Sequence, residues 1–327
     1  MMLKSKKGLG AKKKLVLTAM LGVMLCIAIA LTAAASFTPR VSAADEPATS
    51  AKTMYYPDFT SLEEEQESAA KLNRQIAEEG MVLLKNKDNA LPLSESERDI
   101  TLFGKGSTNL VYGGSGSGSG SGDYVTLQDA LAETGFNVNP LVTDLYANTT
   151  QRVLDGVMFG NSSGSSFIRE SDPDEVLKTA GASYQLYGDA AVIVLSRSGG
   201  EGSDLPMYSV TGHDDPHEHY LELDDYEERL FDIVKAQKEA GVFKKIVVLV
   251  NSSNVLELGG LENDDDIDAI LWMGAPGTNG TLAVGGILNG SVNPSGRTVD
   301  IFPADFTKDP TWYNIGDNGH THFTGVD

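Results

Sequence analysis

Four short runs of apolar residues constrain the fold of this chain more than any other feature of its sequence. They are rich in Val, Ile and Leu and lack the polar alternation of a strand with one face in water. An unbroken run of this length predicts a strand that is buried on both faces of a sheet. The runs are DITLFG (99–104), AAVIVLS (190–196), KKIVVLVNSS (244–253) and DAILWMG (268–274).

Amphipathic stretches of helical period alternate with these runs. Helices are predicted at 125–135, 223–241 and 280–290. The second of these begins with Asp224 and Glu227, the pattern of a capped N-terminus, and ends at Gly241. The alternation predicts an α/β fold with a mostly parallel sheet flanked by helices, a three-layer α/β sandwich with no TIM barrel.

A longer helix is predicted from Ser61, which forms a capping box with Glu64. The segment ALPL at 90–93 ends this element. Its predicted apolar face consists of Leu62, Ala69, Leu72, Ile76 and Val82–Leu84.

The N-terminus is typical of a targeting segment. Six lysines precede an uncharged stretch at 15–37, and Val41 and Ala43 occupy the small-residue positions of a secretory cleavage site. We predict a signal peptide at 1–43, cleaved near Ala43. The alternative is a retained membrane anchor, since 15–37 is long enough to span a bilayer. Both interpretations predict an extracellular protein, either secreted or anchored at the cell surface through residues 15–37.

The charge balance excludes one class of partner. The chain has 46 acidic and 25 basic residues, and seven of the basic ones lie within 1–43. Such an acidic surface repels phosphate backbones, so no nucleic-acid partner is expected. The single cysteine, Cys26, also lies in this segment, which excludes disulfides, thiolate metal sites and cysteine nucleophiles from the mature chain.

A glycine–serine tract at 112–124 lies between a predicted strand and a predicted helix. Ligands meet open α/β sheets at such positions, so we interpret the tract as a ligand-edge loop, the alternative being a flexible linker. It lacks the dinucleotide fingerprint and a Walker lysine, and no cofactor is expected. A second polar segment, 160–175, is predicted to be a surface excursion; its letters GNSSG match a serine-hydrolase elbow, but no strand precedes them.

A loop at 212–220 is rich in histidines and carboxylates. Such a set could bind zinc or another divalent ion. Because the loop is acidic and polar and no second ligand cluster is evident in the sequence, we predict a solvated loop and no metal site. Its titratable residues are His213, Asp214, Asp215, His217, Glu218 and His219.

Glu201 stands between Gly200 and Gly202, shortly after the predicted strand 190–196. The glycines would let a bulky neutral ligand approach this carboxylate closely. If the ligand excludes water, the pKa of Glu201 rises and the residue becomes a general acid at neutral pH. Asp204 would either raise this pKa further by repulsion or cap the next turn. Taken alone, the local pattern favours an exposed carboxylate in a turn that binds no ligand.

Five segments of the chain, read in order, form a more specific pattern. They are RQIAEEGMVLLKNKDNALPL (74–93), ITLFGKGS (100–107), YGGSGSG (112–118), AVIVLSRSGGEGSD (191–204) and LWMGAPGTNGTLAVGGILNGSVNPSGRTVDIFP (271–303). Together they resemble glycoside hydrolase family 3, in the α/β sandwich usually called its C-terminal domain. The resemblance covers about residues 66–306, which leaves 44–65 as a lead-in segment and 307–327 as an exit segment.

The resemblance implies a retaining glycosidase acting on β-linked glucosides, xylosides or related sugars, as oligosaccharides or as aryl or alkyl glycosides. The family's active site lies between this domain and a TIM-like barrel that supplies an aspartate nucleophile. In the family, a stretch similar to SGGEGSD contains the general acid/base, and Glu201 occupies that position here. Gly200, Gly202, Asp204 and Ser115 are then expected to lie around the substrate.

The chain departs from the family pattern because it has no room for the barrel. No nucleophile is therefore expected in this chain, and the barrel is expected in a continued chain or in a partner. A signal peptide in front of the domain resembles family members in which the sandwich precedes the barrel, so the chain is predicted to be the truncated front part of such a protein. A smaller departure is Leu205 and Pro206 after Asp204, where the family often has arginine.

Two other functions stay open at this point. The domain could be a non-catalytic sugar-binding or partner-docking module that has lost its barrel. It could also be a metal-dependent hydrolase built on His217 and His219.

Overall fold

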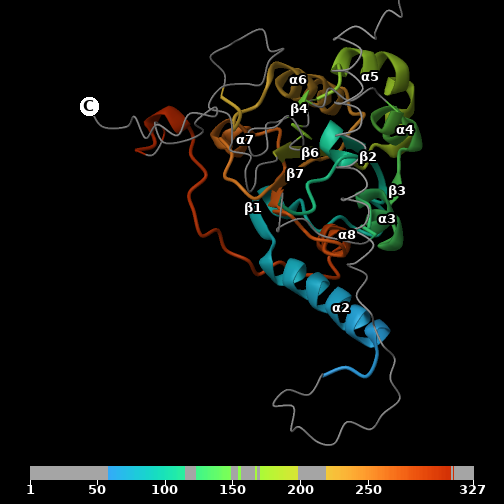
Figure 1. Cartoon of the computed structure of the whole chain (residues 1–327). Coiled ribbons are helices and arrows are strands. Elements are labelled where there is room, and N and C mark those ends of the chain that lie inside the picture. Colours follow the sequence, from blue (N-terminus) through green and yellow to red (C-terminus); the bar gives the residue numbers. More distant parts are fainter. Residues whose placement is uncertain are drawn as a thin grey trace, which may run out of the picture. The chain divides into compact units, whose positions relative to one another are not determined.

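The core of the structure is a six-stranded sheet in the order β1-β8-β7-β6-β2-β3 (Figure 1). Strands β3, β2, β6, β7 and β8 are parallel, and β1 adds antiparallel to β8 at one edge. The strands are β1 (Val82–Asn86), β2 (Asp99–Phe103), β3 (Asn137–Val138), β6 (Ala190–Arg197), β7 (Ile246–Ser252) and β8 (Ala269–Trp272). The described sheet is open, with β1 and β3 as its two edges, and is not a closed barrel.

These elements come from a computed structural model that describes residues 58–114, 123–148, 154–155, 166–167, 170–197, 219–310 and 312. All of them except Asp58 belong to one unit, Phe59–Asp327. The predicted targeting segment at 1–43 lies outside the described residues. Among the helices that are described, none combines the length and the apolar character needed to cross a bilayer.

Side chains of the central strands alternate between two apolar cores, one on each face of the sheet. In β6, even-numbered residues from 190 to 194 belong to the first core and odd-numbered residues from 191 to 195 to the second. The first core includes residues of α2 (Leu62–Gly80), α3 (Leu127–Glu133) and α8 (Thr281–Asn289). The second includes residues of α4 (Pro140–Asn148), α5 (Pro173–Ala180), α6 (Asp225–Glu239) and α7 (Gly259–Asn263). The predicted three-layer, mostly parallel α/β fold is therefore confirmed.

Shorter elements connect these layers. They are the 3₁₀ turns η1 (Lys87–Asn89), η2 (Lys105–Ser107), η4 (Gly181–Tyr187) and η5 (Phe306–Lys308), and the two-stranded antiparallel ribbon β4 (Leu154–Asp155) and β5 (Ser166–Phe167).

The start of α6 and the ends of α6 and α8 lie at the capping residues and glycines that the sequence predicts. The Asp224 side chain accepts from the Glu227 backbone, and the Glu227 side chain accepts from the Asp224 backbone, so the capping box is complete. Gly241 and Gly290 follow the two helices with φ of 77° and 84°. Only glycine adopts these left-handed angles without strain, which explains why both helices end there.

The prediction for the first helix is wrong in two respects. α2 ends at Gly80, and Val82–Leu84 belong to β1, because pairing with β8 overrides the helical pattern of their apolar side chains. The part of the predicted apolar face that lies in α2 is also not buried by the described residues. Leu62, Leu72 and Ile76 are 62%, 56% and 60% exposed, and Ala77 is the only buried residue of α2.

Candidate active site

The predicted catalytic loop leaves the sheet at the end of β6, where the parallel strands present their carboxyl ends. β6 ends at Arg197, and the next described residue is His219. The structure therefore describes the two stems of loop 198–218 and the strand ends around them. Outside the described residues lie all five predicted site residues: Ser115, Gly200, Glu201, Gly202 and Asp204.

A buried ion pair holds the first stem of this loop. The Arg197 guanidinium donates to both carboxylate oxygens of Glu227, from Nη1 at 2.7 Å and from Nη2 at 2.5 Å. The side chains are 4% and 7% exposed. Burial disfavours the charge of Arg197, but the Glu227 carboxylate outweighs burial and holds the arginine pKa above its ordinary value. Arg197 thus stays charged, and its bidentate contact with Glu227 fixes both partners.

The same arginine ties the two stems of the loop together. Arg197 Nε donates to the Tyr220 carbonyl at 2.7 Å, and Nη2 donates to the Glu222 carbonyl at 2.6 Å. Loop 198–218 therefore begins and ends at positions fixed by one side chain. Sequence reasoning missed this arrangement because Glu227 lies 30 residues after Arg197 and was noted only as part of a helix cap.

Asn251, near the end of β7, connects three neighbouring segments. Its Oδ1 accepts from Val111 N at 2.7 Å and from the Ser196 hydroxyl at 3.0 Å. Its Nδ2 donates to the carbonyls of Val111 at 2.9 Å and Gly274 at 2.7 Å. All four hydrogen-bonding positions of this buried amide are used, so the strand ends at this edge form one rigid frame.

Both ends of the glycine–serine tract lie against this frame. The Tyr112 carbonyl accepts from Gly277 N at 2.8 Å, and Val125 N donates to the Thr278 carbonyl at 2.9 Å. The rings of Tyr112 and Tyr124 lie 4.4 Å apart between their centroids. The ends of the tract thus meet the segment that follows β8, while residues 115–122 lie outside the described part, so the ligand-edge interpretation stays a prediction.

A further carboxylate, Glu170, is buried beside the end of β2. Its oxygens accept from Lys105 N at 2.8 Å and from Ser171 N at 3.0 Å. Burial raises the pKa of Glu170 to about 8, so this residue is protonated at neutral pH. Lys105 is also buried, and burial lowers the pKa of its ammonium group while Glu170 opposes that shift.

Neither residue of that pair was singled out from the sequence. The available signal for Lys105 was its position in FGKGS, directly after a strand. The surface-excursion prediction for 160–175 is wrong for its final part, because Glu170 and Pro173 are buried.

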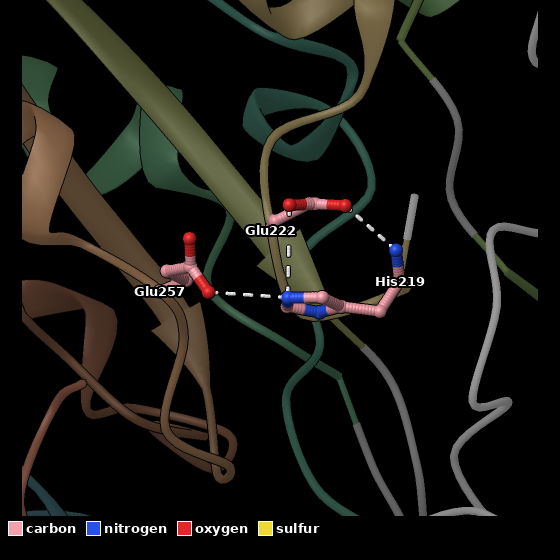
Figure 2. A group of neighbouring side chains, drawn as sticks. All are labelled: His219, Glu222 and Glu257. Carbon is pink, nitrogen blue, oxygen red and sulfur yellow. Dashed lines mark hydrogen bonds and ion pairs between the residues drawn. The ribbon is translucent and has the colours of Figure 1, made fainter. Parts of the chain in front are cut away.

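The second stem carries a cluster of His219, Glu222 and Glu257 (Figure 2). His219 Nε2 lies 3.1 Å from Glu257 Oε2 and 3.6 Å from Glu222 Oε2. His219 is only 6% exposed, so the prediction of a solvated loop is wrong for this residue. The rest of the histidine loop, 212–218, lies outside the described residues. Sequence reasoning named His219 but missed both glutamates, of which Glu257 lies 38 residues away.

An apolar pocket of about 370 Å³ lies near the second stem. Trp272 lines it together with Leu221, Ile301 and Phe306. The Trp272 indole also packs against the second core and donates from Nε1 to the Ser252 carbonyl at 2.8 Å.

Comparison with known proteins agrees with this architecture. Residues 81–324 match the model of the glycosyl hydrolase family 3 C-terminal domain. Beta-glucosidase A of Butyrivibrio fibrisolvens is 32% identical over 258 residues, which cover 73% of this chain and 29% of that protein. Thermostable beta-glucosidase B of Acetivibrio thermocellus is 28% identical over 268 residues, covering 79% of this chain and 30% of that protein.

A solved structure shows the same fold. Beta-glucosidase 3B of Thermotoga neapolitana, in complex with alpha-D-glucose, matches with a TM-score of 0.60 and 28% identity over 76% of this chain and 33% of that chain. The chain thus spans about a third or less of the length of these relatives. The matched region, the six-stranded sheet and the ordered strand-end loops lead to one conclusion: this chain belongs to glycosyl hydrolase family 3, and residues 81–324 form its C-terminal domain.

Proposed function

We propose that this chain is part of an exported retaining β-glycosidase and supplies Glu201 as the general acid/base. The observation that carries the proposal is the fixed origin of the catalytic loop. Glu201 comes four residues after Arg197, the last residue of β6, which the buried pair with Glu227 holds at the carboxyl edge. Carboxyl edges of parallel sheets are where ligands bind open α/β folds.

The substrate class rests on the relatives. Proteins similar to this chain include beta-glucosidases and an exo-1,4-beta-xylosidase of Aspergillus niger. We therefore expect β-linked glucosides or xylosides, as oligosaccharides or as aryl or alkyl glycosides. The relatives are more than three times as long as the region they share with this chain, which supports a further domain, a barrel with the aspartate nucleophile, in a continued chain or a partner.

Glu201 would act twice in the reaction. As the bond between the anomeric carbon and the glycosidic oxygen breaks, the protonated carboxyl gives its proton to the departing oxygen while the nucleophile attacks the anomeric carbon. The Glu201 carboxylate then takes a proton from water, and that water displaces the nucleophile. Retention requires the two carboxyl groups to be about 5–5.5 Å apart, so loop 198–218 must bring Glu201 to that distance from the nucleophile.

The first test compares the native exported protein with its Glu201→Gln variant on alkyl β-glucosides and β-xylosides, whose leaving oxygen needs protonation. Loss of general acid/base catalysis should lower kcat/KM by about 10²–10⁴-fold. For a substrate with a strongly acidic leaving group, which needs less protonation, Glu201→Gln should lower kcat/KM by a smaller factor. The exposed Glu262→Gln change provides a matched control and should leave the rate unaltered. Equal activity of the Glu201→Gln variant and the native protein would contradict the proposal.

The size of the native exported protein tests the other half of the proposal. An intact mass far above the 34.8 kDa of this chain would mean that a barrel follows the domain in one polypeptide. A mass at or below that value, with ligand binding that does not change in Glu201→Gln, would favour a non-catalytic sugar-binding module. An N-terminus near Ala43 would establish export with cleavage, whereas retention of residues 15–37 would establish an anchor.

A further inference from the structure

The cluster at the second stem has the composition and spacing of a metal site. One nitrogen of His219 and one carboxylate oxygen from each of Glu222 and Glu257 all lie within 4.8 Å of one another. Zinc bonds of about 2.0–2.2 Å place neighbouring ligands of a tetrahedral site roughly 3.3 Å apart. The distances from His219 Nε2 to the two carboxylates, 3.1 and 3.6 Å, lie on either side of that value. We propose that His219, Glu222 and Glu257 bind a divalent zinc-type cation.

The three side chains are already oriented toward one another (Figure 2). The second oxygen of Glu222, Oε1, accepts from His219 N at 2.7 Å, and Glu257 Oε2 accepts from Phe306 N at 2.7 Å. The His219 ring packs edge-on against the rings of Phe306 and Trp312, with centroids 5.5 and 4.9 Å away. Backbone donors and packing of this kind orient the ligands of a metal ion, so binding requires little rearrangement.

An acidic pocket gives access to the site from the carboxylate side. It has a volume of about 380 Å³ and is lined by Glu222 and Glu257 themselves. Three more carboxylates line it, from Glu228, Asp232 and Asp264, against the single ammonium group of Lys235. This excess of negative charge concentrates cations. The pocket also leaves room for water as a fourth ligand.

Electrostatics within the cluster favour an added cation. A divalent ion would neutralise the two carboxylates that one imidazole faces. The ligand set selects the ion, since magnesium and calcium prefer oxygen ligands only, whereas zinc accepts an imidazole nitrogen with carboxylate oxygens.

The bound ion would cross-link three segments. Residues 219–222 form the second stem of loop 198–218, Glu257 lies between β7 and α7, and Phe306 lies in η5. We assign the ion a structural role, separate from the proton transfer proposed for Glu201. The competing arrangement is a charged His219 that pairs with both carboxylates and needs no metal.

The test uses the full chain, stripped of metal with a chelator and titrated with Zn²⁺, Mg²⁺ and Ca²⁺ by calorimetry. We expect one Zn²⁺ per chain and binding at least tenfold weaker for the other two ions. Glu257→Gln should weaken Zn²⁺ binding at least tenfold, because an amide is a poor zinc ligand. The glutamine can still accept from Phe306 N, so the change should leave the surrounding structure in place. Asp232→Asn, which changes the pocket but no ligand, should alter the affinity by less than about threefold.

Two of the other four histidines, His213 and His217, lie in the same loop as His219 and require their own control. The double variant His213→Gln/His217→Gln should keep the single Zn²⁺ if the site is the one described. Loss of Zn²⁺ in that double variant with no change in Glu257→Gln would overturn the assignment. So would the absence of any Zn²⁺ binding in the unmodified chain, which would favour the charged-histidine pair. Glu222→Gln provides a second ligand variant if Glu257→Gln does not fold.

Discussion

The two stems of loop 198–218 hold their carboxylates in opposite ways, buried at the first stem and partly exposed at the second. At the first stem, one guanidinium faces one carboxylate, the pair is bidentate, and both groups are almost fully buried. At the second stem, one imidazole faces two carboxylates next to an acidic pocket. The first arrangement is balanced in charge and closed to solvent, whereas the second carries surplus negative charge and is open on one side. The balanced, buried pair is a fixed anchor, whereas the partly exposed cluster is the place where we propose that a cation binds.

Glu170 is another carboxyl group at the same edge of the sheet, and it is held in a third way. It is protonated at neutral pH, because burial raises its pKa to about 8. Around the candidate active site, Glu227 is therefore paired with an arginine, Glu170 is protonated, and two glutamates share His219. Each predicts a different response to mutation or pH.

The largest effect is expected from breaking the closed pair. Arg197→Met removes the guanidinium and leaves the buried Glu227 carboxylate without its partner, which should lower the free energy of unfolding by about 3–5 kcal/mol. Urea denaturation monitored by tryptophan fluorescence measures this loss. Arg229→Met is the matched control, since its bidentate contact with Asp174 is exposed, and it should lower the free energy of unfolding far less. Similar losses in both variants would show that burial does not distinguish the two pairs.

An intermediate effect is expected from the pH dependence of Glu170. Its pKa is about 8 in the folded protein against 4.5 for the ordinary group, so between these values the folded state binds one more proton than the unfolded state. Stability should therefore fall as pH rises from about 4.5 to about 8. Denaturation at several pH values should show a flatter profile for Glu170→Gln. An unchanged slope would mean that Glu170 does not hold its proton.

The smallest effect is expected from the open cluster in the absence of metal. Glu257→Gln keeps an acceptor for Phe306 N and removes one of the two carboxylates that face His219, so metal-free stability should fall by no more than about 1–2 kcal/mol. Denaturation in the presence of a chelator measures this change. A loss as large as that of Arg197→Met would mean that the contacts of the second stem contribute as much to the free energy of unfolding as those of the first.

Much of the fold could be predicted from the sequence because its signals are local. The runs at 190–196 and 244–253 became β6 and β7, and the capping residues of α6 determined where that helix begins. Val82–Leu84 were assigned to a helix because the same apolar letters satisfy both patterns. Only pairing with β8, nearly 190 residues later, decides in favour of a strand.

The site could be predicted only where a motif or a resemblance identified it. Glu201 follows from the resemblance, and its role stays a prediction because it lies outside the described residues. The contacts of Arg197 with Glu227 and of His219 with Glu257 join residues 30 and 38 positions apart. Their proximity is created by the crossover connections of a parallel sheet, which residue spacing does not reveal.

The hydrogen bonds of Asn251 have a consequence for how this domain can diversify. Three segments meet at that one amide: Val111 after η2, Ser196 one residue before β6 ends, and Gly274 two residues after β8. A loop can therefore gain or lose residues farther along without disturbing its neighbours, so long as the residue at the amide keeps its place. Loop exchange between related proteins, whether by evolution or by an engineer seeking a new sugar preference, should succeed when the junctions lie beyond these three residues and fail when they lie before them.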